Sequence, residues 1–400
     1  MKKNIKEIPK SECCGCTACE SVCQNRAIKM NHDEQGFLYP YLDETICIDC
    51  GKCLRVCKSS QDISKGVYYS YASKNRDDEF RRRSSSGGVA HALCVEIIKR
   101  GGVIYGVRVS ENIEKVFTCR AASIAECDGF FGSKYVQADL KDTFHEVLND
   151  LSNHKWVLYI ATSCHIAGLR SFLDEVMCNI DNLITVDFIC HGVPSPLIYR
   201  DYIRFLKRNP FKNLCRFDFR TKNRGWGNGS QNFGCTILYK SKFRVPKTLI
   251  EETDNTLSRI FLRIFFSNVC LRPKCYSCNF ASEFKPSDIT IADFWGCKDA
   301  HPDFFDDKGV SAVLTPSLKG DDLLKSANLD MIISSIDKIS HKQSNMHMHS
   351  MKSEKYDEFW TMYSNYGFKA IARKYGGYTI KNLLKDTIIY QRLKTFIGKN

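Results

Sequence analysis

The sequence predicts a small cysteine-rich α+β module, then a larger α/β domain and a helical basic tail. Three features of the chain lead to this prediction. Residues 1–60 hold two copies of one cysteine pattern, C-x2-C-x2-C-x3-C. Strand-like and helix-like stretches then follow one another over the middle of the chain. Residues 341–400 hold 11 Lys and Arg against 4 Asp and Glu. Their net charge of +7 is more than half of the net charge of +13 of the whole chain.

The chain has 400 residues and 21 cysteines. Its first residues, MKKNIKEIPKSECC, have a basic start but no apolar run behind it, which argues against a signal peptide. No stretch approaches the roughly 18 apolar residues that a membrane-spanning helix needs. These observations predict a cytoplasmic protein. Thiols stay reduced in that compartment, so we expect the cysteines to bind metal rather than to form disulfides.

The repeated cysteine pattern predicts a ferredoxin-like module with two 4Fe-4S clusters. Iron in such clusters favours soft thiolate ligands, and four cysteines complete one cluster. In two-cluster ferredoxins three cysteines of one loop bind one cluster, and the fourth, beyond a short helix, reaches the other. The predicted ligand sets are Cys13, Cys16, Cys19 and Cys57 for one cluster, and Cys47, Cys50, Cys53 and Cys23 for the other.

Structural zinc is the alternative for this segment, but zinc takes its four cysteines from two C-x2-C pairs. Three close cysteines with a distant fourth, present twice, fit two clusters better. The proline that usually follows the last cysteine is replaced by Gln24 and Lys58, and that proline is not a ligand. Cys14 has no role in this scheme and is predicted to be a bystander. The residues QDISKG then form a predicted linker to the domain that must hold the electron acceptor.

The middle of the chain predicts a βαβ unit that delivers two cysteines to one sheet edge. The buried strands WVLYIATSC and LITVDFIC end at Cys164 and Cys190, and the helix HIAGLRSFLDEV lies between them. Ligand sites lie at the carboxyl ends of such strands. The pair Cys275 and Cys278 has the C-x2-C spacing of a metal site, for which iron–sulfur and zinc both remain open. Cys270 and Cys297 flank that pair and could replace either strand cysteine.

The segment SSSGGVAHALCVEIIKRGG predicts a loop that enters a helix, which stops at Gly101–Gly102, and VIYGVRVS predicts the next strand. A second helix is expected over DLKDTFHEVLND. Hydroxyls and unhindered N–H groups at a helix start suit a phosphate group. A helix cap with flexible glycines is the plainer interpretation of the same residues.

Six stretches together resemble the beta-subunit family of coenzyme F420 hydrogenases and dehydrogenases. They are SSSGGVAHAL, GSKYVQ, ATSCHIAGLR, DFICHGVPS, LRPKCYSC and SDITIADFWG, in the order seen in that family and between about Tyr71 and Leu318. The forms ICHGVPS and DFWG look more similar to bacterial relatives found among cell-surface polysaccharide genes. The resemblance implies units at 1–60, 66–150, 151–340 and 341–400, of which the two middle units are parts of one flavoprotein domain.

The resemblance also implies an FAD and a third 4Fe-4S cluster. The flavin pocket would involve Ser85, Ser86, Gly87, Gly88 and Lys134, and the third cluster would bind Cys164, Cys190, Cys275 and Cys278. The chain departs from the family where the usual GTPCQ is ATSCH, so that Ala161, Ser163 and His165 replace Gly, Pro and Gln. His165 and His191 are candidates for proton transfer, and a histidine bonded to a backbone carbonyl is the plainer alternative.

The tail from about residue 375 has apolar residues at helical spacing with Lys or Arg between them, namely Ile380, Leu383, Leu384 and Ile388. This predicts an amphipathic helix docked on the protein, with a membrane surface as the alternative. The basic charge favours an acidic electron donor or acceptor protein rather than nucleic acid, and a solvated basic face would also explain it.

The leading hypothesis is an oxidoreductase that passes electrons between 4Fe-4S clusters and FAD, with an organic substrate that the sequence does not identify. The ferredoxin module should then dock on the face that holds Cys275 and Cys278, because electron transfer requires short distances. The alternative is an electron-transfer subunit, or a scaffold in polysaccharide synthesis, without its own substrate site. A deazaflavin coenzyme is not assumed.

Overall fold

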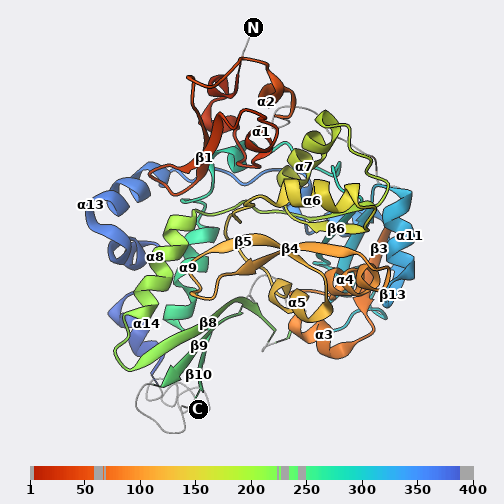
Figure 1. Cartoon of the computed structure of the whole chain (residues 1–400). Coiled ribbons are helices and arrows are strands. Elements are labelled where there is room, and N and C mark those ends of the chain that lie inside the picture. Colours follow the sequence, from red (N-terminus) through yellow and green to blue (C-terminus); the bar gives the residue numbers. More distant parts are fainter. Residues whose placement is uncertain are drawn as a thin grey trace.

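The computed structural model describes residues 4–57, 66, 69–222, 225–226, 234–241 and 249–387. Figure 1 shows a small N-terminal module (red) seated on a larger body built around one sheet. The predicted linker, residues 61–66, lies outside the described residues except for Gly66. No helix of the described part is long and apolar enough to cross a membrane.

The N-terminal module holds an antiparallel hairpin and two four-residue helices, each of which spans the third cysteine of one copy of the pattern. Its elements are η1 (Ile5–Glu7), η2 (Lys10–Glu12), α1 (Ala18–Ser21), β1 (Ile28–His32), β2 (Leu38–Leu42) and α2 (Lys52–Arg55). Gly15 and Thr17 before α1 are left-handed, and Asp49 and Gly51 are left-handed at the matching places before α2. The two cysteine loops therefore turn in the same way, as the repeated sequence pattern predicts.

The body is built on an eight-stranded mixed sheet with the order β13-β3-β12-β11-β7-β6-β4-β5. The strands β11, β7, β6 and β4 are parallel, and the edge pairs are antiparallel. The bounds are β3 (Tyr69–Asn75), β4 (Val103–Val109), β5 (Val116–Ala121), β6 (Val157–Ile160), β7 (Leu183–Phe188), β11 (Ile289–Asp293), β12 (Ser311–Thr315) and β13 (Leu329–Ile333). The predicted βαβ unit is present as β6, α7 and β7.

Helices cover both faces of this sheet because its central strands are apolar on both sides. Ile104 and Leu158 pack with α4 (Val89–Lys99) and α11 (Leu318–Ser326), while their neighbours Tyr105 and Tyr159 pack with α6 (Thr143–Ser152) and α7 (Ser163–Glu175). This alternation follows the two-residue period of a strand. Helix α4 ends where Gly101 and Gly102 predict, and α6 begins four residues after the predicted start at Asp139. The shorter helices are α3 (Asp78–Arg83), α5 (Ile124–Cys127), η3 (Asp128–Phe130), α10 (Cys297–Ala300), α12 (Ile336–Ser340) and η6 (Ser344–Met346).

A second layer lies beside the sheet and explains the mixed pattern after residue 211. The strands β8 (Lys212–Thr221), β9 (Gly234–Ser241) and β10 (Leu249–Thr253) form an antiparallel sheet. The helices α8 (Pro196–Lys207), α9 (Thr256–Phe266) and α13 (Tyr356–Lys374) pack over an aromatic core that includes Tyr202 and Phe261. In Figure 1 these helices stand together on one side of the body.

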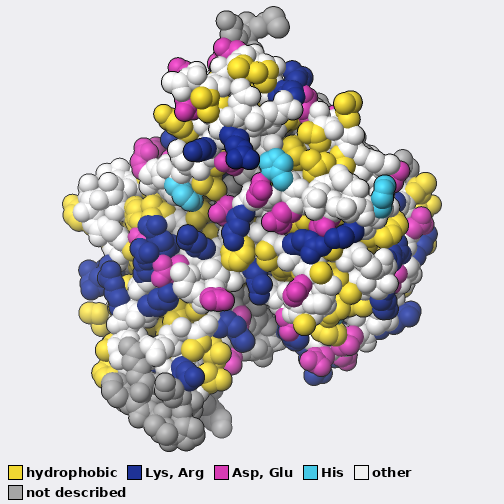
Figure 2. All heavy atoms as spheres, viewed as in Figure 1, with side chains coloured by type: hydrophobic (Ala, Val, Ile, Leu, Met, Phe, Trp, Pro, Cys, Tyr) yellow, Lys and Arg dark blue, Asp and Glu magenta, His cyan; other side chains and the backbone are white. Residues whose placement is uncertain are grey.

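The helix that docks the tail lies earlier than the sequence predicts. Phe359 and Ile371 of α13 are fully buried, whereas α14 (Ile380–Lys385) has six residues and leaves Ile380 79% exposed. The chain turns at Gly376–Gly377, where Gly377 has φ of +73° and the Gly376 carbonyl accepts a bond from Arg263, so one amphipathic helix cannot run through. Ile388 lies outside the described residues. Figure 2 shows Lys and Arg over α8 and α13 with acidic side chains among them.

Candidate functional site

A pocket at the carboxyl ends of β6 and β7 brings together the four cysteines predicted for the third cluster. Cys190 follows β7 by two residues, whereas Cys164 lies in the first turn of α7 and not at a strand end. The short helix η5 (Pro273–Ser277) carries Cys275 beside the loop after β7, where the Val193 N–H donates to the Cys275 Sγ at 3.4 Å. Cys164, Cys190, Cys275 and Cys278 all line the same pocket, whose empty volume is about 680 Å³ including its mouth.

Cys14 also lines this pocket, which corrects its interpretation as a bystander. Contacts with the thiols of Cys16 and Cys164 hold the pKa of the Cys14 thiol well below its usual range. Cys270 and Cys297 do not line the pocket, because Cys270 is buried in the aromatic core and Cys297 packs beneath β12 and β11. Among the described residues, no group of three His, Cys, Asp or Glu side chains is arranged to hold a single metal ion.

The loop ATSCH is anchored from behind by a buried carboxylate. Ser163 donates to Asp187 at 2.6 Å, and Ser287 donates to the other oxygen of Asp187 at 2.8 Å. Burial raises the pKa of Asp187, and the neighbouring Lys285 and the hydroxyl donors act against that rise. Ser163 therefore fixes the start of α7, which carries Cys164.

The two candidate histidines occupy different environments beside the pocket. His165 is 4% exposed, and burial lowers its pKa to about 4. His191 bonds through Nε2 to the Asn268 side chain at 2.8 Å, rather than to a backbone carbonyl, and burial lowers its pKa. Both rings are therefore neutral at pH 7 and can accept or donate a single hydrogen bond at each nitrogen. The segment after α12 closes the pocket with His349 and with Ser350, which donates to the His191 carbonyl.

In the N-terminal module the thiols of both predicted ligand sets lie close to one another, and the crossed division between two clusters stays a prediction. Burial raises the pKa of Cys19 well above its ordinary value, and the nearby thiols of Cys13, Cys57 and Cys53 raise it further. Burial likewise raises the pKa of Cys53, with the thiols of Cys50 and Cys47 beside it. Cys23 packs in the same small core as Cys53. These mutually close thiols, of which Cys19 and Cys53 are buried, suit anionic ligation of cationic iron, which would relieve the cost of ionising them.

The module docks on the face that holds Cys275 and Cys278, as predicted. Lys274 of η5 pairs with Glu12 of η2 at 2.8 Å, and Arg272 donates to the Cys13 carbonyl at 2.7 Å. Gly168 on α7 allows the module to approach closely, because a Cβ there would lie 2.7 Å from both the Cβ and the Sγ of Cys16. Cys16 therefore sits one helical turn from Cys164 along α7.

The two segments predicted to bind flavin lie against each other. Both the N–H and the hydroxyl of Ser133 donate to the Ser85 Oγ, at 2.8 and 2.9 Å. The next residue, Lys134, donates to the carbonyls of Gly129 and Phe131, and burial lowers its pKa to about 7. Gly87 has no room for a side chain, since a Cβ would lie 2.5 Å from the Ser73 carbonyl oxygen. Its N–H donates to Ser311 at 2.9 Å, so this glycine serves packing.

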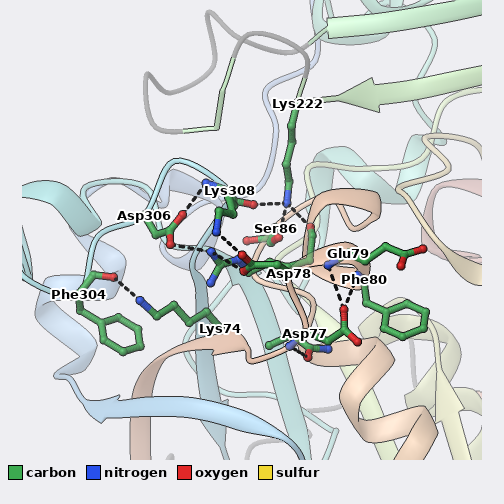
Figure 3. A network of polar contacts seen from close by, with 12 residues as sticks. Lys74, Asp77, Asp78, Glu79, Phe80, Ser86, Lys222, Phe304, Asp306 and Lys308 are labelled. Atoms are coloured by element: carbon green, nitrogen blue, oxygen red, sulfur yellow. Dashed lines mark hydrogen bonds and ion pairs between the residues drawn. The ribbon is translucent and has the colours of Figure 1, made fainter.

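Lys222 holds the SSSGG loop from the end of β8. Figure 3 shows its amine reaching the backbone beside Ser86 and Lys308, and it donates to the Arg81 carbonyl at 2.7 Å as well. Burial lowers the pKa of Lys222 to about 7, and the adjacent charges of Arg220 and Arg81 lower it further. Three carbonyl acceptors match the three N–H bonds of the protonated amine. Sequence reasoning missed this residue because it lies 136 positions from Ser86.

His91, in the first turn of α4, carries two unsatisfied polar atoms beside the SSSGG loop. Its ring is 7% exposed, and neither ring nitrogen has a hydrogen-bond partner in the described structure. The ring stacks on Phe80 at 3.7 Å and on Phe131 at 4.9 Å, and these two rings also stack on each other at 5.8 Å, measured between ring centroids. An unsatisfied imidazole beside a helix start fits a polar ligand at the SSSGG loop. Gly88, with φ of +80°, begins that helix without a side-chain cap.

Aromatic rings connect this region with the cysteine pocket. Tyr135 follows Lys134 and stacks on Phe265 with 5.4 Å between ring centroids. Phe265 in turn meets the His191 ring edge-on at 5.1 Å. The candidate flavin segment and the residue after Cys190 are thus joined by two ring contacts.

Replacing Lys222 with Met should destabilise the protein by about 1–3 kcal/mol or more, because the carbonyls of Ser86 and Lys308 lose the donor that Lys222 supplies and the Arg81 carbonyl keeps only the Ser84 N–H. Urea unfolding measures this loss. Lys308→Met is the matched control, since Lys308 pairs with Asp78 at the surface and is 36% exposed. An exposed ion pair contributes about 0–1 kcal/mol. Equal losses in the two variants would contradict this role of Lys222.

Comparison with known proteins gives two family matches. Residues 154–340 match the family that is described as the C terminus of the coenzyme F420 hydrogenase/dehydrogenase beta subunit. Residues 12–60 match the 4Fe-4S dicluster domain. No curated protein is significantly similar to the chain. Among solved structures, a chain of the xenon-derivatised F420-reducing [NiFe] hydrogenase complex from Methanosarcina barkeri is similar at 12% identity and a TM-score of 0.44, covering 78% of this chain and 93% of that one.

The two matched segments correspond to the module and to the part of the body that carries Cys164, Cys190, Cys275 and Cys278. They include the paired cysteine loops and the strands β6, β7, β11, β12 and β13 of the eight-stranded sheet. Residues 154–340 therefore belong to the C-terminal family of the coenzyme F420 hydrogenase/dehydrogenase beta subunit, and residues 12–60 are a 4Fe-4S dicluster domain.

Proposed function

We propose that the chain is an iron–sulfur flavoprotein oxidoreductase that passes electrons between 4Fe-4S clusters and FAD to reduce or oxidise an organic substrate or coenzyme. The observation that carries this proposal is the pocket in which four cysteines of the body meet directly beside the docked ferredoxin module. Such a pocket extends a two-cluster module toward a reaction site. A module that only received electrons from a partner would not require it.

The third cluster would be held by Cys164, Cys190, Cys275 and Cys278. The buried thiols fit this role, since burial raises the pKa of Cys190 to about 11 and so penalises the bare thiolate. Iron ligation removes that penalty because the metal carries positive charge. The Val193 N–H, which donates to the Cys275 Sγ, would orient that ligand.

FAD would bind where Ser85 meets Ser133, with Ser86, Gly87, Gly88 and Lys134 around it. A flavin supplies the conversion between one-electron and two-electron chemistry. The unsatisfied ring of His91 and the start of α4 support a polar, anionic ligand at this place. The ring contacts through Phe265 support communication with the cysteine pocket.

The histidines and the protein partner complete the proposed function. His165 and His191 would move or hold protons at the pocket, where both rings are neutral at pH 7. The partner would be an electron donor or acceptor protein, of acidic charge, in the cytoplasm.

A second candidate is an electron-transfer subunit that serves a partner enzyme without a flavin of its own. One observation favours it: the Gly87 N–H donates to Ser311 and the Ser86 hydroxyl donates to Val310, so these groups already have partners within the chain. A phosphate would have to use other donors of the loop, such as the N–H groups at the start of α4.

Iron, sulfide and flavin content of protein purified without oxygen tests the proposal. We expect about twelve irons and one FAD per chain, because each of three clusters holds four irons. About eight irons without flavin would contradict the proposal and favour the electron-transfer subunit. About twelve irons without flavin would retain the third cluster and reject the flavin site.

A further inference from the structure

Arg272 is the residue that joins the ferredoxin module to the cysteine pocket. Its side chain is 1% exposed, and it lines the pocket that holds Cys275. The guanidinium donates to the Cys13 carbonyl at 2.7 Å, the Leu38 carbonyl at 2.9 Å and the Gln137 side chain at 2.9 Å. One more N–H points at the Cys13 Sγ at 3.4 Å.

Neighbouring groups pack tightly around the Arg272 guanidinium. It lies over the Tyr39 ring at 4.3 Å from the centroid, and a Cβ at Gly15 would lie 2.8 Å from its Nη1. Gly15 has φ of +71° and belongs to the loop that carries Cys13 and Cys16. The guanidinium therefore lies against the loop that would wrap the first cluster.

This buried cation has no carboxylate within salt-bridge distance among the described residues, although Lys274 two positions later has Glu12. An unpaired buried charge costs several kcal/mol. The neighbouring groups that can carry negative charge are thiols of both predicted ligand sets. Burial acts to lower the pKa of Arg272, but the thiols of Cys13, Cys14 and Cys275, with the Tyr39 phenol, raise it.

We propose that Arg272 is the shared counterion of two clusters, one bound through Cys13 and the other through Cys275. This inference rests on the proposed function, because it assumes that both ligand sets hold clusters. A 4Fe-4S cluster with four thiolates is an anion, and it becomes more negative by one charge when reduced. A fixed cation beside it, with a hydrogen bond to a ligand sulfur, stabilises the reduced state and raises the reduction potential.

Arg272 should affect the reduction potentials of two clusters and leave that of the third unchanged. The hydrogen bonds of Arg272 reach the Cys13 loop and not the ligand set Cys47, Cys50, Cys53 and Cys23, so the potential of the cluster bound there should be independent of this residue. Docking of the module should depend on cluster loading, because only loaded clusters neutralise the buried guanidinium. Arg272 is thus a positioning residue that sets the potential of two neighbouring clusters together.

The test is a potentiometric titration of the anaerobic full-length protein, followed by electron paramagnetic resonance. In Arg272→Gln we expect the reduction equilibrium of two of the three clusters to weaken by at least tenfold. For a one-electron couple this lowers the reduction potential by about 59 mV. The third couple should stay unchanged. Arg272→Lys keeps the charge and should leave all three couples within about threefold of the wild-type equilibrium, about 30 mV.

Arg55→Gln is the matched control, because Arg55 lies at the same module interface but pairs with Glu175 at 2.6 Å. It should leave the two couples assigned to Arg272 unchanged. If the Arg272→Gln protein does not load its clusters, the Arg272→Lys protein is the deciding variant. Clusters that load with wild-type potentials in Arg272→Lys support the role of Arg272 as a counterion. Failure of Arg272→Lys to load its clusters overturns that role and leaves Arg272 a packing residue. Unshifted couples in a loaded Arg272→Gln protein also overturn it. A wild-type protein with two couples instead of three rejects the third cluster of the proposed function, and Arg272→Gln should then shift one of the two.

Discussion

Cys275→Ser is expected to reduce the iron content from about twelve to about eight per chain and to abolish flavin reduction through the clusters, because a cubane needs four thiolates. The fold should survive, since the serine hydroxyl fits the space of the thiol and Cys275 lies at the pocket rather than in the aromatic core. Iron analysis, circular dichroism and the rate of flavin bleaching by reduced ferredoxin clusters measure the three parts of this prediction.

The control variants are Cys270→Ala and Cys297→Ala. Both residues are buried cysteines near the C-x2-C pair, and neither lines the pocket. They should keep about twelve irons and normal flavin reduction, with only the modest destabilisation of a lost buried sulfur. A Cys275→Ser protein that bleaches its flavin at the wild-type rate would contradict the third cluster. Loss of four irons in Cys270→Ala would instead reassign the fourth ligand.

Gly168→Val should separate the ferredoxin module from the body while each part keeps its clusters. The new Cβ would meet Cys16 at 2.7 Å, and Cys16 cannot move without disturbing the loop that binds the first cluster. Overpacking of this kind costs about 1–3 kcal/mol or more, which lowers the equilibrium constant for docking of the module by about one to two orders of magnitude. Hydrogen exchange at η2, α1 and η5 should rise, and electron transfer into the body should slow.

Asp174→Val is the control for Gly168→Val, because it introduces the same β-branched residue on the exposed face of α7. It should leave hydrogen exchange at the module interface unchanged. Loss of the clusters themselves in Gly168→Val, with exchange unchanged at the interface, would contradict the docking argument and place Gly168 in the support of a ligand loop.

The parts of the site that the sequence predicts are those encoded by short spacing. The repeated cysteine spacing predicts two matching loops, from Cys13 to Cys23 and from Cys47 to Cys57. The left-handed backbone at Gly15 and Asp49 confirms that the two loops turn alike. The βαβ unit around Cys164 and Cys190 follows from apolar periodicity, which is local. The end of α4 at Gly101 follows from the same kind of signal.

The predictions that fail are those in which distant segments compete for one surface. The tail from residue 375 has helical periodicity, yet α13 takes the available apolar groove beside α8 and α9, and Gly376–Gly377 turns the chain away. Cys14 looks redundant within its own motif, because the pocket that it lines is formed by residues far along the chain. His91 and Lys222 carry no sequence signal of their own.

The sequence by itself determined that the chain holds paired cysteine loops, a βαβ unit and a C-x2-C pair, because each is a pattern of a few residues whose chemistry depends on spacing alone. Only the tertiary structure decided which thiols share a pocket and which cation lies between them. Arg272 and Cys13 are 259 positions apart, and their contact arises from the packing of the module on the body. Such contacts follow from shape and charge between surfaces, and no local pattern encodes them.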